Sequence, residues 1–120
     1  MIKKVLLLDD SKFMRMVLRD IIDATGDFKV IGDVDDGSKV LDAYKMYKPD
    51  IVTMDIIMPT SGMDAVKEIK KFDPKAKIVM ITAMGDQEKL MNETIEAGAE
   101  KRYITKPFKQ DEIREVLKSL

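Results

Sequence analysis

Short runs of apolar residues alternate along the chain with longer segments in which apolar residues recur every three or four positions. The short runs are rich in Val, Ile and Leu and have the length of buried strands. They cover residues 4–8, 28–34, 51–54, 77–82 and 103–105. The longer segments have the spacing of amphipathic helices, so the pattern predicts five strands that alternate with five helices.

Capping residues and helix breakers limit each predicted helix. The first helix has Ser11 as its N-cap, Gly26 as its stop, and an apolar face formed by Met14, Val17, Leu18, Ile21 and Ile22. The second covers about 38–47 and ends before Pro49, and the third ends before Pro74 with Ala65, Val66, Ile69 and Phe72 on its apolar face. The fourth covers about 86–97, and the fifth has Ile113, Val116, Leu117 and Leu120 on one face.

Strands that alternate with helices are typical of an α/β fold, in which helices cover both faces of a parallel sheet. We expect one domain, residues 1–120. Right-handed crossovers in so short a chain favour a doubly wound, flavodoxin-like five-stranded parallel sheet with five helices and the strand order 2-1-3-4-5. In such a sheet, ligands bind at the carboxyl ends of strands 1 and 3.

Three acidic residues lie at those ends. Asp9 and Asp10 follow the first apolar run, and Asp55 follows the third. Taken alone, Asp9 and Asp10 also fit the start of a helix. Three neighbouring carboxylates repel one another, however, so we predict that a divalent cation or a phosphoryl group enters between them.

The composition narrows the chemistry of this site. Basic and acidic residues number 21 and 22 and are spread along the chain, so nucleic acid is not an expected partner. The apolar run near the N-terminus is too short for a signal peptide or a membrane span, so we expect a cytoplasmic protein without a membrane partner. Cys and His are absent, which leaves carboxylate, hydroxyl and lysine chemistry.

Four short motifs in this order resemble the receiver domains of two-component response regulators, and the resemblance covers the whole chain. They are Asp9-Asp10, Asp55 with Met58-Pro59 behind it, Thr82-Ala83, and Lys106-Pro107-Phe108. The segment 9–15 is more similar to CheY-like single-domain chemotaxis regulators than to the receivers of transcription factors.

The resemblance implies a magnesium site and a phosphoacceptor. Asp10 would be a direct magnesium ligand and Asp9 a ligand through water, with Asp55 and the backbone carbonyl of Ile57 completing the set. Asp55 would accept a phosphoryl group from a histidine kinase, while Lys106 supplies a cation and a cis bond to Pro107 orients it.

The resemblance also implies a switch. The Thr82 hydroxyl would turn toward the phosphoryl group, and Tyr103 would move inward with it. Ile57, Ala83 and Met84 would flank the phosphoryl group. Since Ile57 and Met84 are apolar and cannot orient an attacking water, we expect slow loss of phosphate.

We expect this chain to be a monomeric signalling protein and not an enzyme. Its surface of helix 4, strand 5 and helix 5 would bind an output partner, either a motor switch component or an adaptor. A chemotaxis-type histidine kinase would act upstream, docking near Met14 and Met16, and a phosphatase is a further candidate partner.

Two loops depart from the family pattern, and other interpretations stay open. Gly62 comes one residue early after Pro59, and three residues instead of two separate Ala99 from Tyr103. The chain also fits a phosphorelay intermediate or an excised receiver of a larger regulator. A metal-dependent aspartyl-phosphate phosphatase would need a second aspartate where Ile57 lies. A flavodoxin-like binding module would suffer repulsion between Asp9-Asp10 and its ligand's phosphate.

Overall fold

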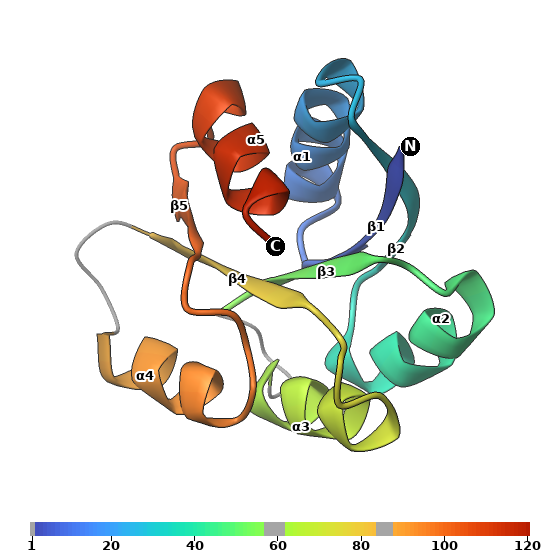
Figure 1. Cartoon of the computed structure of the whole chain (residues 1–120), viewed down its shortest axis with the longest axis vertical. Helices are drawn as coiled ribbons and strands as arrows, with labels where there is room; N and C mark the ends of the chain where they lie inside the picture. Colours follow the sequence, from blue (N-terminus) through green and yellow to red (C-terminus); the bar gives the residue numbers. More distant parts are fainter. Residues whose placement is uncertain (1, 57–61, 84–87) are drawn as a thin grey trace.

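The computed structural model describes residues 2–56, 62–83 and 88–120. The strands are β1 (Lys3–Leu8), β2 (Phe28–Val34), β3 (Ile51–Asp55), β4 (Ile78–Ala83) and β5 (Ile104–Lys106). The helices are α1 (Lys12–Ala24), α2 (Val40–Tyr47), α3 (Gly62–Phe72), α4 (Glu88–Glu96) and α5 (Gln110–Lys118), with a 3-10 turn η1 (Gly37–Lys39) before α2. Strands and helices alternate as the apolar pattern predicts (Figure 1).

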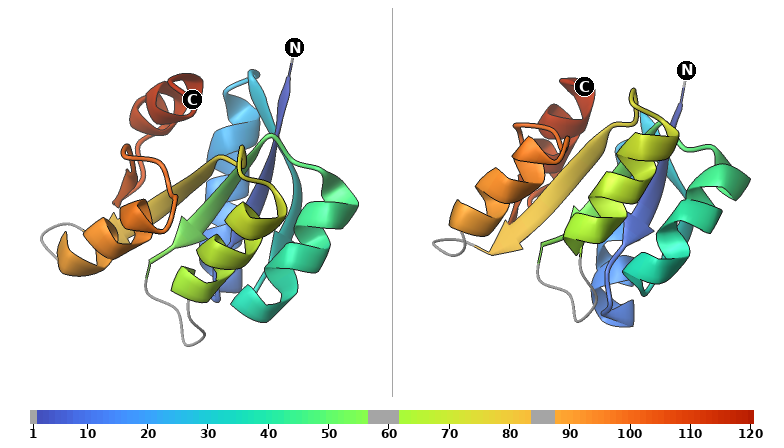
Figure 2. Two further views of the ribbon diagram at one scale, coloured as in Figure 1. Left: turned by 60° about the horizontal axis from the view of Figure 1, so that its bottom comes forward. Right: turned by 90° about the horizontal axis from the view of Figure 1, so that it is seen from below.

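All strand pairs are parallel, and the order in the sheet is β2-β1-β3-β4-β5. The predicted doubly wound order 2-1-3-4-5 is therefore confirmed. Helices α1 and α5 cover one face of the sheet, and α2, α3 and α4 cover the other (Figure 1). The three helices of the second face lie side by side across the strands (Figure 2). This topology brings the carboxyl ends of β1 and β3 next to each other.

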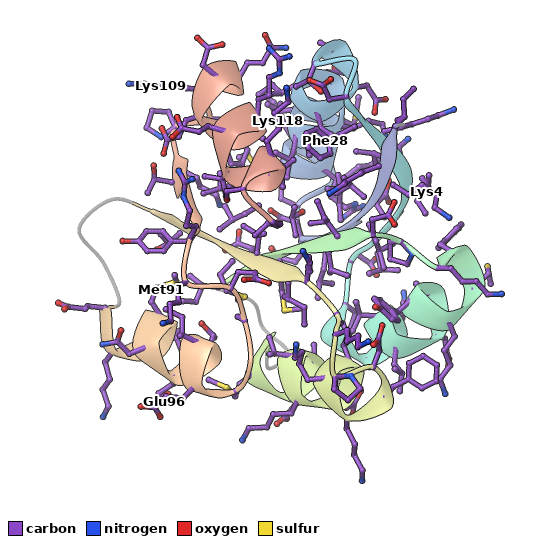
Figure 3. All side chains as sticks on the ribbon, viewed as in Figure 1. Lys4, Phe28, Met91, Glu96, Lys109 and Lys118 are labelled. Atoms are coloured by element: carbon purple, nitrogen blue, oxygen red, sulfur yellow. The ribbon has the colours of Figure 1, made fainter. Side chains whose placement is uncertain are left out.

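The core consists of two layers, one on each face of the sheet. In β1, Val5 and Leu7 pack in the layer under α1 and α5, whereas Leu6 and Leu8 pack in the layer under α2, α3 and α4. Phe28 belongs to the first layer and Met91 to the second, and Figure 3 labels both among the side chains that fill the two layers. Because side chains alternate along a strand, the sheet side on which a residue lies follows from its position.

Helix limits follow the local signals that the sequence carries. Ser11 caps α1, since its side chain accepts a hydrogen bond from the Met14 amide at 3.2 Å. Beyond the end of α1, Gly26 has a φ of 78°, a left-handed conformation that favours glycine. Helix α2 ends at Tyr47, and its C-cap Lys48, directly before Pro49, is also left-handed with a φ of 49°. The start predicted for the fourth helix, near residue 86, lies outside the described residues.

Two predictions on aromatic residues were wrong. Tyr103 lies before β5 and not within it, because β5 pairs with β4 only from Ile104 onward, and the Tyr103 side chain is 43% exposed. Phe72 was expected on the apolar face of α3, but it is 53% exposed at the end of the helix. Its ring instead meets the Tyr44 ring edge-on, with centroids 6.2 Å apart.

Candidate functional site

Three strand ends bring a cation and two carboxylates together. Asp55 ends β3 and Lys106 ends β5, and the Lys106 Nζ lies 2.8 Å from the Asp55 Oδ2. The Asp55 side chain is 8% exposed and that of Lys106 is 28% exposed, so water screens this pair less than a surface ion pair. The peptide bond between Lys106 and Pro107 is cis, as the resemblance implies.

Asp9 is the second carboxylate of the site. It follows Leu8, the last residue of β1, and is only 3% exposed. Its Oδ1 accepts a hydrogen bond from the Ser11 amide at 2.8 Å, whereas its Oδ2 is buried and has no hydrogen-bond partner among the described residues. Burial raises the pKa of Asp9 to about 6; the Ser11 hydrogen bond opposes this rise and the nearby charge of Asp55 adds to it.

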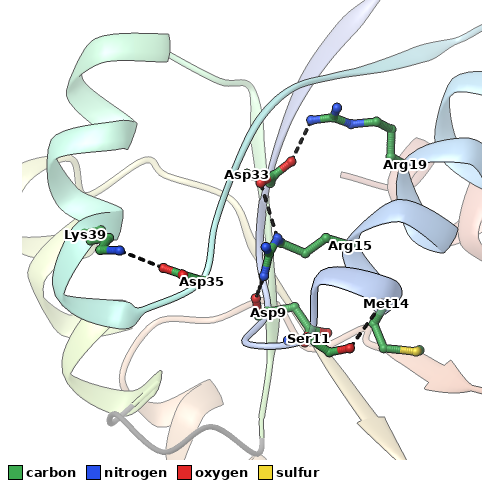
Figure 4. A network of polar contacts seen from close by, with 8 residues as sticks. All are labelled: Asp9, Ser11, Met14, Arg15, Arg19, Asp33, Asp35 and Lys39. Carbon is green, nitrogen blue, oxygen red and sulfur yellow. Dashed lines mark hydrogen bonds and ion pairs between the residues drawn. The ribbon is translucent and has the colours of Figure 1, made fainter.

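An ion-pair network lies behind Asp9 (Figure 4). Arg15 on α1 donates from Nη1 to the Asp9 backbone carbonyl at 2.6 Å, and its Nε lies 3.2 Å from an oxygen of Asp33 on β2. Arg19, one turn further along α1, pairs with the other oxygen of Asp33 at 2.7 Å. Sequence reasoning did not single out these residues. The only available signal was the placement of Arg15 and Arg19 four residues apart on one helix face.

Asp10 differs from Asp9 because its side chain is exposed. Among the described residues, no three acidic side chains converge into a group that could hold a metal. The fourth predicted ligand, the carbonyl of Ile57, lies outside the described residues. The fit to magnesium therefore rests on Asp9 and Asp55, two adjacent hard-oxygen donors, and on the unsatisfied Oδ2 of Asp9.

The predicted switch residues lie on β4 and beside β5. Thr82 is the second-last residue of β4, is 5% exposed, and pairs in register with Thr105. The next residue, Ala83, ends β4 and pairs with Lys106, so it lies next to the site. Tyr103 is half-exposed before β5. Met84, the predicted flanking residue after Ala83, lies outside the described residues.

The longer loop before β5 is accommodated away from the site. The Glu100 amide donates to the carbonyl of Ile78, the first residue of β4, at 2.8 Å. Arg102 pairs with Glu115 on α5 at 3.3 Å. The added residue therefore lies near the amino end of β4, and the spacing from Ile104 to Lys106 is unchanged. The shortened loop before Gly62 lies outside the described residues.

The response regulator receiver domain model matches residues 5–118, so the chain belongs to the response regulator receiver domain family. The chemotaxis protein CheY of Thermotoga maritima is 50% identical over 116 residues, which are 96% of this chain and 94% of the relative. CheY of Bacillus subtilis is 42% identical over 118 residues, which are 98% of this chain and 96% of the relative. Within the family the chain is therefore a CheY-like receiver of chemotaxis signalling.

The solved structures agree with the sequence relatives. One chain of the CheX-CheY-BeF3-Mg2+ complex from Borrelia burgdorferi superposes with a TM-score of 0.86 and 33% identity, covering 98% of this chain and 87% of that chain. This membership favours a receiver over the phosphatase and the flavodoxin-like module that the sequence left open. No helix in the described part of the chain is both long and apolar enough to span a membrane.

Proposed function

We propose that this receiver accepts a phosphoryl group on Asp55 from the phosphohistidine of a partner kinase. An Oδ of Asp55 attacks the phosphorus, a P–O bond forms, the P–N bond breaks, and the imidazole leaves. The observation that carries this proposal is the Asp55 carboxylate, whose side chain is 8% exposed at a strand end, with the Lys106 ammonium 2.8 Å away. A carboxylate is a weak nucleophile, so catalysis depends on positive charge placed where the phosphoryl oxygens lie, and Lys106 supplies part of it.

Magnesium is the cofactor of this proposal. Asp10, Asp55 and the carbonyl of Ile57 would bind it directly and Asp9 through water. Bound magnesium would supply the remaining positive charge at the phosphoryl oxygens. The buried, unsatisfied Oδ2 of Asp9 supports the assignment, as does the superposition on a chain of a complex that contains BeF3 and Mg2+.

The output of the proposed switch is binding. Thr82 and Tyr103 would carry the change from Asp55 to the surface of α4, β5 and α5, where a motor switch component or an adaptor binds. The CheY relatives and the CheX-CheY complex support a partner of this kind and a chemotaxis-type kinase upstream. A phosphatase would reset the switch, all within the cytoplasm. Met16, 59% exposed on α1, would contribute to kinase docking with Met14.

The flanking residues Ile57 and Met84 would make the phosphorylated state long-lived. Neither apolar side chain can orient the water that hydrolyses the aspartyl phosphate. Replacing them together, Ile57→Asn with Met84→Glu, should speed the loss of phosphate, measured as the decay of the phosphorylated mass after the phosphodonor is removed. An unchanged decay rate would refute this part of the proposal.

Intact-mass spectrometry after incubation with acetyl phosphate and magnesium tests the central proposal. The natural chain should gain one phosphoryl group only when magnesium is present, and Asp55→Asn should gain none. Asp20→Asn is the matched control, because Asp20 is an exposed aspartate on α1. A phosphoryl group that persists in Asp55→Asn would place the acceptor elsewhere, and its absence from the natural chain would contradict the proposal.

A further inference from the structure

Arg15 connects three separate parts of the chain near the site. It lies on α1, donates to the backbone carbonyl of Asp9 after β1, and pairs with Asp33 on β2 (Figure 4). Its side chain is 13% exposed, compared with 43% for Arg19 on the same face of the helix. Arg15 therefore occupies a largely buried position in which both of its contacts have defined geometry.

The contact with Asp9 fixes a peptide bond and not a side chain. The Asp9 carbonyl belongs to the planar peptide group that joins Asp9 to Asp10. A charge-assisted hydrogen bond of 2.6 Å holds the plane of this group, and with it the direction in which the chain enters Asp10. On the other side, the Ser11 amide holds the Asp9 Oδ1 at 2.8 Å. The turn that carries both acidic residues is therefore held at the backbone and at the side chain.

The turn needs this support because the neighbouring carboxylates of Asp9 and Asp55 repel each other. Asp9 and Asp55 are close enough for the charge of one to affect the other, and their repulsion favours a movement of the turn away from β3. Arg15 opposes this movement, since it is anchored by Asp33, and Arg19 holds Asp33 at 2.7 Å. The network transfers the restraint to β2, which pairs with β1 along the sheet.

We propose that Arg15 is a positioning residue for the magnesium site: it holds the Asp9–Asp10 peptide so that both carboxylates face the metal before it binds. This inference rests on the proposed function, because it assumes that Asp9 and Asp10 are magnesium ligands. Residues that orient metal ligands in this way change metal affinity by about 10- to 100-fold when they are removed. Arg15 contacts the Asp9 carbonyl and Asp33, so its proposed role is to position the ligands and not to take part in the chemistry.

The chain offers a matched control for this proposal. Arg19→Ala and Arg15→Ala each remove an arginine that pairs with Asp33, but only Arg15→Ala removes the bond to the Asp9 carbonyl. Magnesium affinity is measured by calorimetric titration of the unphosphorylated protein, and urea unfolding without magnesium gives the stability of each variant. We expect Arg15→Ala to weaken magnesium binding by about 10- to 100-fold and Arg19→Ala to change it by less than about twofold.

Two further variants keep the test decisive. Arg15→Lys can reach the carbonyl or Asp33 but cannot imitate the two-point contact, so it should restore only part of the affinity. Asp33→Asn leaves Arg15 in place but removes its charged anchor. It should weaken magnesium binding less than Arg15→Ala does, and it replaces that variant if Arg15→Ala does not fold.

The outcomes separate this inference from the proposed function. If the natural chain binds magnesium and Arg15→Ala, or Asp33→Asn in its place, binds it equally well, the positioning role is wrong while the metal site stands. Equal weakening by Arg15→Ala and Arg19→Ala would also overturn the inference, because it would indicate a general loss of stability. If the natural chain does not bind magnesium, the proposed metal site fails, and this inference fails with it.

Discussion

The two edges of the sheet, meaning the amino ends and the carboxyl ends of its parallel strands, differ in how their polar groups are paired. At the amino edge, the Tyr44 hydroxyl donates to the Asp73 Oδ2 at 2.7 Å, and the Lys75 amide donates to the other oxygen at 3.0 Å. At the carboxyl edge, Asp9 lies near Asp55 and leaves its Oδ2 without a partner among the described residues. Within the described part of the chain, both oxygens of Asp73 therefore accept hydrogen bonds, whereas only one oxygen of Asp9 does.

The pKa values of Asp73 and Asp9 shift in opposite directions because, of these two described residues, only Asp73 has both of its oxygens paired. The Tyr44 hydrogen bond lowers the pKa of Asp73, and burial followed by the Asp73 contact raises the pKa of Tyr44. Burial raises the pKa of Asp9 to about 6. The contact between Tyr44 and Asp73 therefore stabilises the folded chain at the amino edge. At the carboxyl edge, the ionised Asp9 destabilises the folded chain, and a bound cation can restore that stability.

The largest effect should come from removing the cation of the carboxyl edge. Lys106→Met removes the ammonium 2.8 Å from Asp55, and we expect phosphorylation by acetyl phosphate to slow by about 100-fold or more. The rate is read from the mass of the phosphorylated protein over time. Lys70→Met is the control from the amino edge: Lys70 donates to the carbonyls of Pro74 and Ala76, so its loss should lower stability and leave the rate unchanged. Equal slowing in both variants would contradict a special role of Lys106.

The next largest effect should be a gain of stability at the carboxyl edge. Asp9→Asn removes one of two neighbouring carboxylates, so the magnesium-free protein should become more stable at pH 7 by about 1–2 kcal/mol. This is less than the full value of the pKa shift, because the Lys106 side chain is 28% exposed and solvent screens the charges of the site. The same variant should lose most of its stabilisation by magnesium, measured as the rise of the melting temperature on adding the ion. If Asp9→Asn is less stable than the natural chain without magnesium, the Asp9 carboxylate does not destabilise the folded protein.

The dependence of folding stability on pH should differ between the two edges. Asp9 has a folded pKa of about 6 against an ordinary value of 3.8, so the folded chain binds a proton more tightly than the unfolded chain. Its contribution to stability is fully present below about pH 3.8 and is lost as the pH rises through about 6. Asp73 has a lowered pKa and behaves in the opposite way: its contribution to stability is fully present above about pH 3.8 and is lost only when the pH falls below that value.

Without magnesium, the melting temperature should therefore rise by a few degrees as the pH is lowered from 7 to 5. Asp9→Asn should flatten this part of the curve. A natural chain whose melting temperature is constant or falls over the same range would argue against a raised pKa for Asp9.

The sequence predicted the carboxyl edge better than the amino edge. The strand order and the places of Asp9, Asp55 and Lys106 followed from apolar runs and from what comes directly after them. The contact between Tyr44 and Asp73 joins residues 29 positions apart through the ends of α2 and α3, and no local pattern encodes it. The spacing of Arg15 and Arg19 places them on one helix face but does not reveal their shared partner Asp33 on β2. Likewise, strand pairing and not apolar character decides that Tyr103 lies outside β5.

The smallest effect should come from the amino edge. Tyr44→Phe keeps the ring, which meets Phe72 edge-on, but removes the hydroxyl that donates to Asp73. The melting temperature should fall by a few degrees, because the Asp73 oxygen loses a partner that the fold provides. Magnesium affinity should stay unchanged, since the hydroxyl lies at the opposite edge of the sheet from Asp9. Tyr47→Phe is the control, because Tyr47 is a second tyrosine of α2, is 39% exposed and has its ring beside Gly32. A change of magnesium affinity in Tyr44→Phe would show that the two edges are coupled, and the contrast between a stabilising edge and a binding edge would have to be replaced by one connected network.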